Sequence, residues 1–263
     1  MLRRILSKIK TNPLAVVKPE VVRPSDEVTT VGRIFDTPLV VKGITWIPAV
    51  QLVTWPIMAW YAGKRDPRRS LAKRLGVGAL TMPIVLGSEW CHNLAHAAVA
   101  RWIGKPMDAI RITWGMPLLV YYNIEDENVT PRQHILRALG GPAFNALALG
   151  VAVPLQRSIR RVSLSRELLD TAVTTNTFLL SVGLLPLPGI DGGPILKWSL
   201  VERGRCPKEA DEVVRKVDGW LGLVLGLSGA AALKRRRWLL GGFCLQLAAI
   251  ALGVAFGFLK EKD

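Results

Sequence analysis

Long apolar runs alternate with short basic segments along most of this chain. Six runs are long or apolar enough to cross or enter a membrane as helices: residues 43–63, 75–100, 138–156, 171–190, 219–233 and 238–259. A span must hold about 20 residues to cross a hydrocarbon layer of ~30 Å. Residues 219–233 fall short of this length and are rich in glycine, which predicts a short or partial span. Residues 75–100 contain one carboxylate, Glu89.

Composition supports a membrane protein over a soluble enzyme. Half of the residues are hydrophobic and 21% are charged, with 35 Lys and Arg against 20 Asp and Glu and a net charge of +15. So basic a chain could bind nucleic acid, but its basic residues cluster between the apolar runs, as in loops that flank membrane helices. We therefore expect a multi-pass protein of the cell membrane, surrounded by the lipid bilayer, that does not bind nucleic acid. Its oligomeric state stays open.

The chain divides at the start of the first apolar run. Residues 1–17 are basic and weakly amphipathic, which predicts a short surface helix on anionic lipid. Residues 18–42 are polar and contain three prolines, which predicts a linker. Residues 1–42 thus form a basic N-terminal surface segment and linker, and residues 43–263 form a membrane domain.

Two of the three histidines stand four residues apart in the second run. On a helix His92 and His96 share one face, one turn apart, and can bind the same metal ion. Packing or hydrogen bonding between helices is the alternative for this pair. Glu89 and Asn93 lie on the same sector, and an ionisable group inside a span indicates a functional site, although a protonated structural Glu89 would also fit.

A carboxylate that could complete a metal site follows the fourth run. Asp191 comes after Pro186 and Pro188, which end a helix, and before two glycines, which permit a tight turn. Irregular backbone at membrane depth is tolerated only where it lines a cavity. Asp191 is therefore either a third ligand or a solvated residue in an interfacial turn.

Three motifs, taken in order, resemble the site-2 protease family, the zinc intramembrane peptidases. The family has H-E-x-x-H, then G-P-x-x-N, then P-x-x-D-G. This chain has His92-Asn93-Leu94-Ala95-His96, Gly141-Pro142-Ala143-Phe144-Asn145 and Pro188-Gly189-Ile190-Asp191-Gly192. Asn176 also precedes Asp191 by the distance of a family asparagine. Residues 107–122 resemble the family's membrane-associated β-hairpin, and the alternation of Ile110, Ile112 and Trp114 independently predicts a strand there.

The resemblance implies a fold and a site. The fold is an all-α polytopic membrane protein of about six transmembrane helices, with a small β-hairpin between the second and third spans. Residues 75–198 form the metallopeptidase-like core, built on spans 75–103, 134–156 and 168–190. The implied site holds one zinc per chain on His92, His96 and Asp191, with substrate contacts from Asn145, Asn176 and Thr113. The resemblance also implies a cytosolic N-terminus, whereas the dense basic loops on the opposite side favour the reverse orientation.

The departures from the family concern catalysis. Asn93 stands where the family has its catalytic Glu, which takes a proton from water at the zinc. An amide cannot accept that proton, and the loss of general acid–base catalysis typically costs ~10²–10⁴-fold. Glu89 has the right chemistry but lies about 6 Å further along the helix axis. Gly183 replaces an asparagine thought to hold the substrate, and Gly189 replaces a common proline.

The working function is therefore that of a site-2 protease-like metallopeptidase homologue acting on membrane protein or transmembrane peptide substrates, with proteolysis weak or lost. The alternative is a catalytically inactive pseudoprotease that binds membrane proteins as a scaffold or chaperone. A small ion transporter is a third possibility, but the inverted repeat typical of transporters is not visible. His134, at the start of the third span beside Arg132 and Arg137, is expected to be an interfacial side chain.

Overall fold

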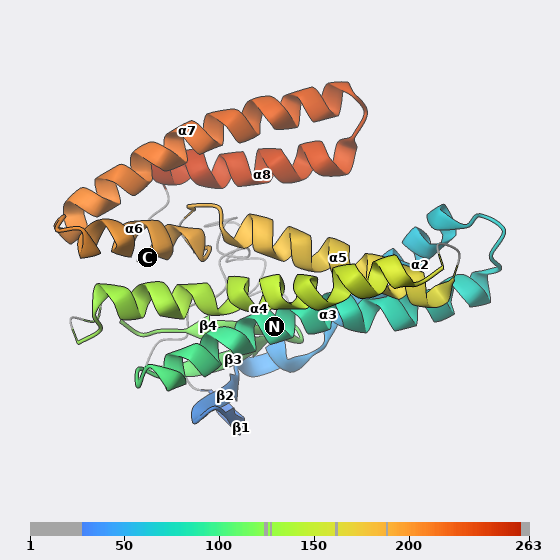
Figure 1. The fold of residues 1–263 in the computed structure, drawn as a ribbon, viewed down its shortest axis with the longest axis horizontal. Coiled ribbons are helices and arrows are strands. Elements are labelled where there is room, and N and C mark those ends of the chain that lie inside the picture. Colours follow the sequence, from blue (N-terminus) through green and yellow to red (C-terminus); the bar gives the residue numbers. More distant parts are fainter. Residues whose placement is uncertain (1–27, 124–125, 127, 161–162, 188, 259–263) are drawn as a thin grey trace, which may run out of the picture.

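The protein is mostly helical with one small sheet (Figure 1). The computed structural model describes residues 28–123, 126, 128–160, 163–187 and 189–258. The helices are α2 (Ala49–Arg65), α3 (Leu71–Trp102), α4 (Pro131–Ser158), α5 (Leu164–Gly183), α6 (Gly192–Glu202), α7 (Pro207–Lys234) and α8 (Trp238–Ala255), with a 3-10 turn at Gly43–Trp46. The strands are β1 (Thr29–Ile34), β2 (Thr37–Val41), β3 (Ala109–Thr113) and β4 (Met116–Val120). The predicted surface helix over residues 1–17 lies outside the described residues.

Three of the described helices, α4, α7 and α8, are long and apolar enough to cross a membrane. Helices α2, α3 and α5 cover most of the other three apolar runs, although residues 43–48 precede α2 and residues 184–187 and 189–190 follow α5 outside any α-helix. The number of about six spans stays a prediction. Helix α7 is longer than the 15-residue run from which it was predicted, because a polar segment beginning at Pro207 extends it toward the N-terminus.

The predicted hairpin over residues 107–122 is confirmed as β3 and β4, but it belongs to a larger sheet of order β1-β2-β3-β4. The linker expected over residues 18–42 is wrong for its described part, because β1 and β2 pair there as an antiparallel hairpin. Phe35 and Asp36, both with positive φ (50° and 62°), make the tight turn between them, which matches the twist of a two-residue hairpin. The hairpin joins the rest of the sheet through a parallel pairing of β2 with β3.

The helices that carry the sequence motifs pack directly on one another (Figure 1). Helix α3 contacts both α4 and α5, and α4 also contacts the short helix α6. Helices α7 and α8 lie side by side as a pair. The pair contacts the rest of the body through α6, through Leu187 of the α5–α6 turn, which packs with Leu247 and Ala251 of α8, and through Phe178 of α5, whose ring centroid lies 5.3 Å from that of Phe243. The turn between α5 and α6 therefore faces α3 and α4, which places Asp191 opposite the two histidines.

Candidate metal centre

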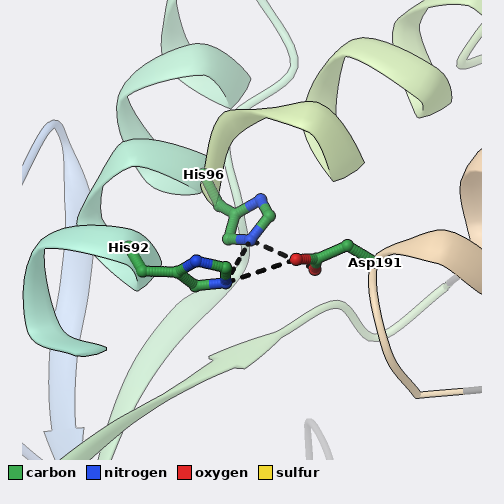
Figure 2. Close-up of side chains that lie close together, drawn as sticks. All are labelled: His92, His96 and Asp191. Atoms are coloured by element: carbon green, nitrogen blue, oxygen red, sulfur yellow. Dashed lines mark hydrogen bonds and ion pairs between the residues drawn. The ribbon is translucent and has the colours of Figure 1, made fainter. Parts of the chain in front are cut away.

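His92, His96 and Asp191 converge on one point (Figure 2). The two histidines extend from α3, and Asp191 stands at the N-terminal end of α6, where the chain turns after α5. The His92 and His96 Nε2 atoms lie 3.2 Å apart. Asp191 Oδ2 is 3.3 Å from His92 Nε2, and Asp191 Oδ1 is 3.2 Å from His96 Nε2. The structure thus brings together the three residues predicted as metal ligands.

These three side chains fit a zinc ion. Two imidazole nitrogens and a carboxylate are an ordinary zinc ligand set, and bonds of ~2.0–2.1 Å in a tetrahedron put neighbouring ligand atoms about 3.3 Å apart. The separation of the two Nε2 atoms has that size, and so does the distance from each Nε2 to one of the two Asp191 oxygens, Oδ2 for His92 and Oδ1 for His96. Asp191 Oδ2 is buried and, within the described part of the chain, accepts no hydrogen bond. A cation would satisfy a buried carboxylate oxygen that no donor reaches.

Two glycines of α4 make room for the histidines. A Cβ atom on Gly141 would lie 2.4 Å from ring atoms of both His92 and His96, and a Cβ on Gly140 would lie 2.8 Å from the His96 Cα. Both distances are far below van der Waals contact. The glycine pair therefore lets α4 approach α3 closely enough to pack against the two imidazole rings.

Hydrogen bonds behind the rings fix their orientation. His92 Nδ1 lies 2.6 Å from Asn145 Oδ1, and His96 Nδ1 lies 2.7 Å from the carbonyl oxygen of Arg137. Since these oxygens can only accept, a proton on each Nδ1 satisfies both bonds and leaves the two Nε2 lone pairs for a cation. The Gly141 N–H also lies 3.3 Å from His96 Nδ1. Metal-binding histidines are typically oriented in this way by a partner on the other ring nitrogen.

The asparagines expected to contact substrate form a chain of hydrogen bonds behind His92. Asn145, which is fully buried, donates from Nδ2 to Asn176 Oδ1 at 2.8 Å, and Asn176 donates from Nδ2 to Ser88 Oγ at 3.0 Å. The Asn145 side chain thus has both polar atoms engaged. Thr113 ends β3, and its Oγ1 is buried with no partner among the described residues. Substrate contacts from these three residues stay predictions.

Asn93 and Glu89 bond to each other beside the metal centre. Asn93 Nδ2 donates to the Glu89 carbonyl oxygen at 2.9 Å and to Glu89 Oε1 at 3.1 Å. The Glu89 side chain thus reaches back toward the position of the missing base, closer than the separation along the helix axis suggests. Glu89 does not belong to the group of side chains that could hold the metal, which consists of His92, His96 and Asp191 in the described chain.

A cavity of about 240 Å³ opens beside the centre. Its lining combines two of the predicted ligands with apolar, aromatic and basic side chains: His96, Leu119, Tyr121, His134, Arg137, Ala138, Gly189, Ile190, Asp191, Pro194 and Trp198. The prediction of His134 as an interfacial side chain is wrong, because it is 7% exposed and stacks on Trp198 with ring centroids 3.9 Å apart. The sequence could have indicated this burial, because His134, Arg137 and Gly141 are spaced i, i+3 and i+7 and so lie on one face of a helix.

No family model matches the sequence, and no curated protein matches it. Among solved structures, the chain is similar to the site-2 protease from Methanocaldococcus jannaschii, with 14% sequence identity, a TM-score of 0.49, and coverage of 90% of this chain and 96% of that chain. Site-2 proteases are also the family that the three sequence motifs resemble.

Proposed function

We propose that this chain is a membrane-embedded zinc metallopeptidase homologue of the site-2 protease kind, with one zinc per chain on His92, His96 and Asp191. The convergence of these three side chains on one buried point carries the proposal. Zinc in such a site acidifies water and polarises a carbonyl group, which is the chemistry of peptide hydrolysis. The residues of the chain orient the ligands, shape the cavity and hold the protons at the histidine Nδ1 atoms.

The sheet supports a peptide substrate. Strand β4 pairs only with β3 in the described sheet, so its other edge is open to a further strand. Leu119 of β4 lines the same cavity as His96 and Asp191. A segment of a membrane protein, unwound into a strand and paired with β4 by main-chain hydrogen bonds, would therefore pass beside the metal centre. Thr113, in the register pair opposite Met116, lies at the turn end of this hairpin.

The residues near the centre support weak or absent proteolysis. Asn93 occupies the general-base position, and its amide donates to Glu89. Glu89 is the remaining carboxylate that could take a proton, but it lies outside the ligand group. The second candidate function is therefore a pseudoprotease that binds a membrane protein at β4 without cutting it. The hydrogen bond from the Asn93 amide to Glu89 favours this function, because it occupies both side chains that stand nearest the general-base position.

Zinc content tests the site. We expect one zinc per chain in wild-type protein purified in detergent, a reduced content in each of His92→Ala, His96→Ala and Asp191→Ala, and none in the triple variant. His134→Ala is the matched control, because it removes the remaining histidine of the chain and should leave zinc in place. Stoichiometric zinc in the triple variant would refute the centre.

A model transmembrane substrate then separates the two candidate functions. A pseudoprotease should bind the substrate and release it intact, whereas an enzyme that uses Glu89 should cleave it and lose that activity in Glu89→Gln. Cleavage that survives both Glu89→Gln and His92→Ala would mean that the chemistry lies elsewhere in the protein.

A further inference from the structure

The cavity beside the metal centre holds two buried polar atoms that the fold does not satisfy. The Nε2 atom of His134 and the hydroxyl of Tyr121 are both buried and have no hydrogen-bond partner among the described residues. Burying such groups without partners costs free energy, so a ligand that bonds to them is favoured. Burial raises the pKa of Tyr121 to about 12, which keeps the hydroxyl protonated and able to donate.

A buried positive charge lines the same cavity. Arg137 is 9% exposed, and its Nε and Nη2 atoms donate to the Lys105 carbonyl oxygen at 3.1 and 2.6 Å. Its guanidinium lies over the Tyr121 ring, 4.8 Å from the centroid. No carboxylate forms an ion pair with it within the described residues. A buried cation is stabilised by a nearby anion. Arg137 therefore favours an anionic ligand in this cavity.

The spacing of residues along α4 relates these groups to the metal centre. His134 precedes Gly141 by two turns of α4, or ~10 Å along the axis, and Gly141 underlies both histidine ligands. An extended peptide covers ~10 Å in about three residues. A ligand whose main chain lies at the centre can therefore reach His134 with a group one to three residues away, along walls formed by Leu119, Ile190 and Trp198.

We propose that this cavity binds a carboxylate of a peptide held at the metal centre, either an acidic side chain or the C-terminal carboxylate. A carboxylate accepts from the Tyr121 hydroxyl and from Arg137, so it satisfies the unpartnered hydroxyl and offsets the buried charge at once. A lysine or arginine side chain would be repelled by Arg137. This inference rests on the proposed function, since it requires a metal that holds the peptide.

Peptide hydroxamates test the proposal in the zinc-loaded full chain, because the hydroxamate group binds zinc and no cleavage is needed. Four otherwise identical probes end in Glu amide, Gln amide, Leu amide or Leu free acid. We expect the Glu amide or the Leu free acid to bind about tenfold more tightly than the Gln and Leu amides. The pair of probes that differs by Glu against Gln isolates charge, and the two acids distinguish a side chain from a C-terminus.

Variants of the cavity and a minimal probe make the test specific. Arg137→Gln should abolish the preference for the acid, and the isosteric Tyr121→Phe should reduce it. Acetohydroxamate, which reports on the metal alone, should bind equally to all three proteins. If acetohydroxamate does not bind the wild type, the metal centre of the proposed function fails. If acetohydroxamate binds but the Glu and Gln probes bind equally, the carboxylate site is refuted while the centre stands.

Discussion

Glycines allow close packing in two regions, the body formed by α3, α4, α5 and α6 (the α3–α6 body) and the α7–α8 pair, but they accommodate different side chains in each. In the body, Gly141 makes room for two imidazole rings, whose polar atoms are buried and hydrogen-bonded. In the pair, Gly222 and Gly229 make room for apolar side chains, since a Cβ on either would lie 2.7 or 2.9 Å from the Cγ of Leu252 or Leu245. Small residues that let two helices approach are a common means of helix association in membranes.

The difference shows where chemistry is located in this chain. The body carries a continuous chain of hydrogen-bonded polar side chains, from the half-buried Ser88 through the buried Asn176 and Asn145 to His92, and such a chain is stable only when its members satisfy one another. The α7–α8 interface is built mainly from glycine, alanine and leucine. Leu247 and Ala251 of α8 also form an apolar cluster with Leu187 of the α5–α6 turn. A substitution in the body should therefore affect metal binding, and one in the pair should affect packing alone.

The largest expected effect is that of a methyl group at Gly141. Because the new Cβ would lie 2.4 Å from both imidazoles, Gly141→Ala should displace the ligands and abolish stoichiometric zinc. Gly226→Ala is the matched control on α7, where the Cβ would meet the Ala248 Cβ at an ordinary 3.8 Å. Metal analysis and thermal unfolding of both purified variants would measure this. Full zinc content in Gly141→Ala would show that the rings are free to move.

Restoring the general base is expected to have the next largest effect. Asn93→Glu should raise peptidase activity by one or more orders of magnitude, within the ~10²–10⁴-fold that acid–base catalysis typically contributes. The new carboxylate would face Glu89, which now accepts from Asn93 at 3.1 Å, and two adjacent carboxylates would hold a proton between them. The double variant Asn93→Glu, Glu89→Gln removes that repulsion and should be the more active. Unchanged cleavage in both variants would favour the binding-only function.

Gly183 limits how far the family pattern can be restored. A Cβ at this position would lie 3.2 Å from Asp191 Oδ2, so Gly183→Asn, the other change toward the family, would press on a metal ligand. Asn93→Glu without it is therefore the better test of catalysis. Zinc content of Gly183→Asn would measure the cost directly.

The grouping of His92, His96 and Asp191 could be predicted because its signals are local and the resemblance to the site-2 protease family connects them. His92 and His96 share a face by helical spacing alone, and the prolines before Asp191 indicate the break that lets its carboxylate turn inward. The cavity beyond the centre could not be predicted, because it depends on the contact between α4 and α6. The sequence places Trp198 far from His134, and only the packing of these helices stacks the two rings.

The sheet illustrates the same limit. The alternation of Ile110, Ile112 and Trp114 predicts β3 from neighbouring residues. The structure contains that strand, but it ends at Thr113, and Trp114 lies in the following turn with a φ of 55°. Strand β2 has no comparable local signal, since its proline and polar neighbours are typical of a linker. Its pairing with β3, such as Leu39 with Ile110, joins segments about 70 residues apart, and pairings of that range depend on tertiary packing.

Substitutions along the asparagine chain should have graded effects on the metal. Asn145→Ala removes the acceptor of His92 Nδ1 and should weaken zinc affinity by about 10–100-fold, as is typical for the partner of a ligating histidine. Asn176→Ala acts one bond further away and should have a smaller effect, and Ser88→Ala a smaller one still. Titration with a competing chelator would give the three affinities. Equal losses from all three would mean that the effect comes from general unfolding.

The smallest effect on the metal is expected from a substitution in the α7–α8 pair. Gly222→Val would push a side chain into Leu252, and overpacking of this kind typically costs about 1–3 kcal/mol. Because the added side chain would meet α8 and none of the three predicted metal ligands, the cost should appear as a lower unfolding temperature with zinc content unchanged. Gly242→Val, where no atom lies within 4 Å of the added Cβ, is the control that should change neither quantity. Loss of zinc in Gly222→Val alone would show that the pair supports the metal centre through its contacts with α5, α6 and the turn between them, and the two regions would then form one functional unit.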